Sequence, residues 1–114
     1  MHFEESLLTG MVKPFPVVDR MLCAQGFTRR GNIDFTYDMR IEDAASRTMY
    51  YLRIPTHYAR QRANDRSLLQ LDQPYIGKYP GPNRFQRAQA IPNEIVEAAQ
   101  HKVAEIASYL STVR

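Results

Sequence analysis

The chain has 114 residues, of which 44% are hydrophobic and 24% are charged, a composition ordinary for a globular protein and long enough for one core. We therefore expect a single domain over residues 1–114 and exclude a chain that is disordered throughout. No apolar run reaches the roughly 20 residues needed to cross a bilayer, and the acidic N-terminus lacks the features of a signal peptide. One cysteine, Cys23, excludes an internal disulfide and suits a reducing compartment. These features predict a cytoplasmic protein without a membrane partner.

The net charge is only +3, but the basic side chains concentrate in the middle of the chain. Residues 53–87 hold seven basic and two acidic side chains, whereas the flanking segments are close to balance: Arg53, Arg60, Arg62, Arg66, Lys78, Arg84 and Arg87 against Asp65 and Asp72. An anionic partner would therefore be sought in this segment.

The first expected elements are short. Residues 6–12 are expected to form a short strand or an extended lead-in. Pro16 is tolerated in a first helical turn, and apolar residues at helical spacing predict a short helix over about 16–25. Gly26 then suits the left-handed conformation that ends many helices. A strand over 27–29 is expected to follow.

The clearest strand signal runs from Ile33 to Ile41, where apolar and polar residues alternate. The polar connection 42–47 is short enough for a hairpin to a second strand at 49–55. Pro55 has no N–H to donate, so it is expected to end that strand or to place its tip at an edge, and residues 56–65 are expected to form a loop.

The hairpin is expected to place the apolar residues of both strands on one face. The expected pairs are Ile41 with Thr48, Met39 with Tyr50, Tyr37 with Leu52, and Phe35 with Ile54. On the other face, Arg53 would lie opposite Thr36, with Asp34 and Asp38 diagonal to it.

The second half of the chain predicts two strand segments and a helix. A strand over 67–71 is expected, with an interruption at 72–74, a continuation over 75–79, and a turn without regular structure at 80–83. Pro92 is expected to open a long amphipathic helix whose apolar stripe is Ile95, Ala99, Val103, Ile106, Leu110 and Val113. The expected fold is therefore α+β: an antiparallel sheet of about four strands with a short N-terminal and a long C-terminal helix packed on one face.

Several of these landmarks resemble the YugN-like family of small bacterial proteins. The similar positions are Gly31-Asn32 with Asp34, Tyr37-Asp38, the run Tyr50-Tyr51-Leu52-Arg53-Ile54-Pro55, Leu71 followed by Pro74-Tyr75, Lys78-Tyr79, and the long helix after a proline. Ile33 stands where an aromatic residue is usual in the family, and Asp72-Gln73 replaces a glycine-containing turn. The resemblance implies an α+β fold but no particular activity.

The candidate binding residues follow the central strand and the basic segment. Arg53 is either an anion-binding arginine on a rigid strand or the partner of Asp34 or Asp38. The candidates are Arg53, Tyr51, His57, Arg60 and Arg62. Tyrosines among arginines also permit stacking of single-stranded nucleic acid, although no recognition motif is present.

No catalytic constellation, metal-ligand spacing or cofactor motif stands out. The histidines share no ligand spacing, and Cys23 has no base named by the sequence. We therefore expect a non-enzymatic interaction domain, one that binds a protein partner or forms a homodimer through the face bearing Tyr51 and Arg53. The alternative is an anion or single-stranded nucleic-acid binder that uses segment 53–87.

Overall fold

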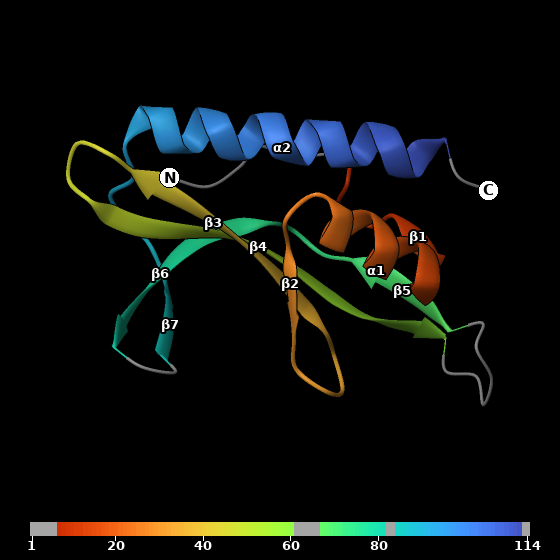
Figure 1. Ribbon diagram of the computed structural model, residues 1–114. Helices are drawn as coiled ribbons and strands as arrows, with labels where there is room; N and C mark the ends of the chain where they lie inside the picture. The colour runs from red at the N-terminus through yellow and green to blue at the C-terminus, as the bar shows by residue number, and fades with distance from the viewer. Residues whose placement is uncertain (1–6, 61–66, 82–83, 113–114) are drawn as a thin grey trace.

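The computed structural model describes residues 7–60, 67–81 and 84–112 and is organised around one long strand, β4 (Thr48–Arg60). β3 (Thr36–Asp43) pairs antiparallel with one edge of β4, and β5 (Leu68–Leu71) and β6 (Tyr75–Gly81) pair in succession with the other edge. Short strands extend the sheet: β1 (Val12–Pro14) beside β5, β2 (Thr28–Arg30) beside β3, and β7 (Arg84–Arg87) beside β6. The described strands thus form one forked antiparallel sheet (Figure 1).

The α+β class is confirmed, but the expectation of about four strands is wrong, because the sheet has seven. β2 lies within one residue of the strand expected over 27–29, whereas β1 and β7, with the sequences Val-Lys-Pro and Arg-Phe-Gln-Arg, are only three and four residues long. Such segments bury little, so they lack the apolar alternation by which a strand is recognised in sequence.

Both helices lie on the same side of the sheet, as expected. They are α1 (Phe15–Ala24) and α2 (Asn93–Ser111), the latter lying across the sheet in Figure 1. Their buried side chains join those of Leu52 and Ile54 in one core cluster. The stripe of α2 is buried as expected at Ile95, Ala99, Val103, Ile106 and Leu110, while Val113 lies outside the described residues. Neither helix is apolar enough over sufficient length to cross a membrane.

The register of the β3–β4 hairpin differs from the expected one by two residues. Tyr37 pairs with Ile54 instead of Leu52, and pairing ends at Asp43 with Thr48. A shift of two keeps every side chain on its expected face, so alternation cannot distinguish the two registers. The shift does place Asp38, instead of Thr36, directly opposite Arg53.

Pro55 does not end β4, and residues 56–60 are strand instead of loop; residues 61–66 lie outside the described part. Pro55 falls between the stretches of β4 that pair with β6 and with β5, where residues 72–74 interrupt the ladder. Its carbonyl accepts a hydrogen bond from the Asp72 N–H at 2.8 Å. Pro55 lacks an N–H at the position where the neighbouring strand is itself interrupted, at residues 72–74. No partner there needs that donor, so the proline fits within the strand.

Two other expectations are also wrong. Ile33 is 72% exposed and precedes β3, which begins only at Thr36, because the chain turns at Gly31 with a positive φ of 89°. Pro80 and Gly81 belong to β6 although they were expected in an irregular turn. Proline is compatible with this strand because the register shifts between Lys78 and Gly81.

Candidate functional site

The odd-numbered residues of β4 lie on the sheet face opposite the helices. Tyr51 and Arg53 are therefore on the same face, with Asp38 across the ladder on β3 and Tyr75 across it on β6. Rings and guanidinium groups from β2, β6 and β7 gather around them. We define this aromatic–arginine face by Arg30, Asp38, Tyr51, Arg53, Tyr75, Tyr79, Phe85 and Arg87.

Asp38 is the polar centre of the face. Arg53 binds it with both ends of the carboxylate, from Nε to Oδ1 and from Nη2 to Oδ2, each at 2.8 Å. Arg30 Nε donates to Oδ2 at 3.0 Å, and the Tyr79 hydroxyl donates to the same oxygen at 3.2 Å. The Asp38 side chain is only 1% exposed, so this is a buried, fully hydrogen-bonded carboxylate with two cationic partners.

The Arg53 guanidinium has hydrogen-bond partners along its N–H edges and an aromatic ring over its plane. The Phe85 ring lies over it, with 3.6 Å between Cζ and the ring centre, and the same Nη2 that binds Asp38 also donates to the Tyr79 hydroxyl at 3.2 Å. The hydrogen bonds that Arg53 donates to the Asp38 carboxylate raise the pKa of Arg53. The side chain is 15% exposed. Two roles were considered for Arg53, anion binding and pairing with an aspartate, and its geometry is that of pairing with Asp38. Arg53 thereby links the side chains of the aromatic–arginine face.

Phe85 is the hub of the aromatic cluster. Its ring centre lies 5.1 Å from that of Tyr79, 5.8 Å from Tyr75 and 6.5 Å from Tyr51, all in edge-to-face geometry. Gly77 makes this position possible, because a Cβ there would lie 2.4 Å from the Phe85 ring. Burial raises the pKa of Tyr79, and the neighbouring Asp38 carboxylate raises it further.

The rim of the face is cationic. Arg87 lies over the Tyr75 ring at 4.1 Å, and Arg30 lies near the Tyr79 ring at 5.7 Å. Arg40, opposite Tyr51, is exposed and forms no hydrogen bond or ion pair with a described residue. These guanidinium groups leave a positive border around a neutralised centre.

The structure does not unite all the candidate residues. His57 pairs with Asp72, with 2.8 Å between Nδ1 and the carboxylate, and both side chains are partly exposed. Arg60 ends β4, but its side chain is outside the described part, as is the whole of Arg62. Of the five candidates, Tyr51 and Arg53 are therefore the two that the structure places on the aromatic–arginine face.

A second polar cluster lies on the helix side around Asp19. Its carboxylate accepts hydrogen bonds from Arg29 at 3.0 Å and from the hydroxyl of the buried Tyr37 at 2.9 Å. Burial and the nearby Asp19 raise the pKa of the Cys23 thiol, which is the opposite of what a cysteine nucleophile needs. Within the described residues, no group of three or more His, Cys, Asp or Glu side chains is placed to hold a metal ion.

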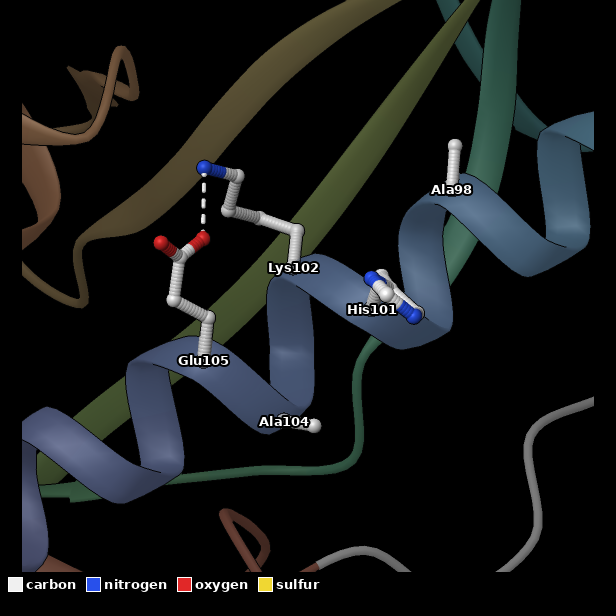
Figure 2. Close-up of a pocket in the computed structure, with 5 residues that line it drawn as sticks. All are labelled: Ala98, His101, Lys102, Ala104 and Glu105. Atoms are coloured by element: carbon white, nitrogen blue, oxygen red, sulfur yellow. Dashed lines mark ion pairs between the residues drawn. The ribbon is translucent and has the colours of Figure 1, made fainter.

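A hollow of about 590 Å³ lies along the outer side of α2 and is lined by Ala98, His101, Lys102, Ala104 and Glu105. Figure 2 shows Lys102 and Glu105 joined as an ion pair, at 2.9 Å, with His101 set apart from them. The hydrogen bond from Lys102 lowers the pKa of Glu105. All the lining residues come from one helix, so the hollow lacks the convergent walls of a binding pocket.

The sequence alone did not single out the residues that complete the face. Phe85, Tyr79, Arg30 and Arg87 come from short strands whose pairing brings them to Tyr51 and Arg53. The available signal is the spacing of Phe85 and Arg87, which are two residues apart and so share a face once β7 is known to be a strand.

The architecture defines the class of protein: a small α+β domain with a forked antiparallel sheet, two helices on one face, and an aromatic–arginine cluster on the other. The same fold occurs in a crystal structure described as the uncharacterized conserved protein YugN from Geobacillus kaustophilus HTA426. The TM-score is 0.80 at 22% sequence identity, over 99% of this chain and 96% of that one. The fold implied by the resemblance to the YugN-like family is thus confirmed. No protein-family model matches the chain, and no curated protein does.

Proposed function

We propose that this protein is a non-enzymatic interaction domain that binds its partner on the aromatic–arginine face. The observation that carries the proposal is the gathering of four aromatic rings and three arginines on the sheet face that neither helix covers. Aromatic and arginine side chains dominate the binding energy of many interfaces, because they combine a large contact area with directional donors. A cytoplasmic location is part of the proposal and accords with the single cysteine.

The charge of the rim favours an anionic partner over a second copy of the chain. Arg30, Arg40 and Arg87 border the face, whereas Asp38 is sealed beneath it. Two copies meeting face to face would oppose positive rims, which costs free energy. An acidic partner or a single-stranded nucleic acid would instead be complementary to them.

The neighbouring sequence supports the same choice. No acidic residue occurs between Asp72 and Glu94, a stretch that includes Lys78, Arg84 and Arg87. Figure 1 shows that its hairpin, β6–β7, turns away from α2. Rings that can stack with bases lie beside cations that can contact phosphates, as in proteins that bind single strands without sequence preference.

The test is the binding of a fluorescein-labelled dT12 oligonucleotide, followed by anisotropy over a range of salt concentrations. We expect affinity to fall steeply with salt, and the Arg87→Gln variant to weaken binding and reduce the logarithmic salt slope by about 0.7, the share of one phosphate contact. Arg20→Gln is the matched control, because Arg20 is an exposed arginine on α1.

Failure of the wild-type protein to bind the oligonucleotide at low salt would remove the nucleic-acid alternative. Equal loss in both arginine variants would show that binding follows net charge and not this face. Binding of an acidic protein, with the same preference for Arg87 over Arg20, would support the interaction domain with a protein partner.

A further inference from the structure

A hollow of about 500 Å³ opens at one border of the aromatic–arginine face. We call it the Tyr51 hollow. The residue that caps α1 and strands β2, β3 and β4 supply its walls, which include Gln25, Thr28, Arg30, Asp38, Arg40 and Tyr51. Unlike the hollow on α2, it draws side chains from four elements, so polar groups converge on it from several sides.

The hollow carries excess positive charge. Asp38 is the one acidic residue among its described walls, and its carboxylate is already bound by Arg30 and Arg53. One negative charge is therefore shared by two guanidinium groups, and Arg40 adds a third that forms no ion pair with a described residue. An anion entering the hollow would meet net attraction and no exposed carboxylate.

The uncharged walls add hydrogen-bonding capacity and a ring. The Thr28 side chain is exposed, and the Gln25 amide oxygen accepts a hydrogen bond from Lys102 at 3.1 Å, which leaves its NH₂ group free to donate to a ligand. Tyr51 forms the aromatic wall. A volume of about 500 Å³ exceeds what one oxyanion needs and falls within the range of small-molecule sites.

We propose that the Tyr51 hollow binds a nucleoside phosphate unit, with the phosphate held by Arg40 and Arg30 and the base placed against Tyr51. One guanidinium group can donate two parallel hydrogen bonds to a phosphate, and the donors of Arg40 are available for this. The inference rests on the proposed function and adds to it a defined subsite at the border of the face. The unit belongs either to a free nucleotide or to a strand that continues across the rings toward Arg87.

The experiment is a titration of the full, ¹⁵N-labelled chain with UMP, uridine, inorganic phosphate and dT12, followed by amide NMR shifts. We expect UMP to shift the signals of Thr28, Arg40 and Tyr51, and uridine to have a much smaller effect. Arg40→Gln should weaken UMP binding about tenfold, as expected when charge-assisted hydrogen bonds are lost. Arg20→Gln should leave it within about twofold.

The two sources of the phosphate give different results. Binding of dT12 at least tenfold tighter than UMP, with shifts that extend into β7, identifies a strand; comparable affinities identify a free nucleotide. Equal shifts with uridine and UMP, or unchanged affinity in Arg40→Gln, would overturn the subsite. If Arg87→Gln still weakened dT12 binding, the proposed function would stand without the subsite, whereas loss of that effect too would remove both the subsite and the nucleic-acid alternative of the proposed function.

Discussion

Arg53 is stacked against Phe85, with 3.6 Å between its guanidinium carbon and the ring centre, while the same guanidinium is bound edge-on to Asp38. One side chain from the middle of β4 thereby connects β3 and β7, which lie on opposite sides of it in the sheet. The face away from the helices has its own small packed cluster, built from rings and a buried ion pair instead of aliphatic side chains.

Replacing Arg53 is expected to be strongly destabilising. Arg53→Ala leaves the Asp38 carboxylate buried with only Arg30 and Tyr79 as partners, and we expect a loss of about 3 kcal/mol in the free energy of unfolding. Urea denaturation at neutral pH measures it. Arg40→Ala is the matched control and should stay within about 0.5 kcal/mol, because the side chain is exposed and unpaired among the described residues. Equal losses would contradict the assigned role of Arg53.

Two glycines of β6 should respond differently to the addition of a methyl group. A Cβ on Gly77 would lie 2.4 Å from the Phe85 ring and 2.5 Å from the Gln86 carbonyl, whereas nothing lies within 4 Å of a Cβ on Gly81. We expect Gly77→Ala to cost about 1–3 kcal/mol and to change the near-ultraviolet circular dichroism of the tyrosines. Gly81→Ala should leave both close to the wild type. A tolerated Gly77→Ala would show that the ring cluster can move apart without loss.

Alkaline pH should expose the burial of Tyr37. Burial raises the pKa of Tyr37, and its hydrogen bond to Asp19 raises it further. The folded state therefore keeps the phenolic proton of Tyr37 at a pH at which the unfolded state, with a tyrosine pKa of about 10, has released it. The contribution to stability is complete below that pH and is lost as the pH rises.

Urea denaturation at pH 8 and pH 11 compares the two conditions. We expect the wild-type protein to lose more stability than Tyr37→Phe between them, while Tyr109→Phe, which removes an exposed hydroxyl, loses as much as the wild type. The same decline in all three proteins would mean that Tyr37 does not govern the alkaline limb.

Self-association can be tested by light scattering at micromolar concentration with the wild type and Tyr51→Ala. The positive rim of Arg30, Arg40 and Arg87 leads us to expect a monomer for both proteins at low salt. A wild-type dimer that Tyr51→Ala separates would instead establish the homodimer through this face and contradict the preference for an anionic partner.

The faces of the sheet could be predicted from the sequence, but its lateral order could not. Alternation assigned Tyr50, Leu52 and Ile54 to the core and Tyr51 and Arg53 to the other side, and the burial of these residues agrees. Alternation has a period of two, so it was blind to the two-residue shift that brings Asp38 opposite Arg53. The partner of a strand is decided by tertiary packing, which no local pattern reveals.

The residues of the candidate site could likewise be predicted only in part. Tyr51 and Arg53 were identifiable because large residues on a non-core face stand out in a strand of clear period. Phe85 was not, because its role depends on the absence of a side chain at Gly77 and on a strand of four residues, both visible only once the hairpin is folded.

The β6–β7 hairpin meets β4 over only three residue pairs, Tyr51 to Arg53 against Tyr75 to Gly77. The remainder of its attachment on this side is the ring cluster and the Arg53 guanidinium. A segment held by few ladder bonds opens locally at a lower free energy than the core beside it. Amide hydrogens of β7 should therefore exchange with solvent sooner than those of Leu52 and Ile54, and any ligand seated on these rings will slow that exchange. Hydrogen exchange in a four-residue strand thus becomes a sensor for an unidentified ligand.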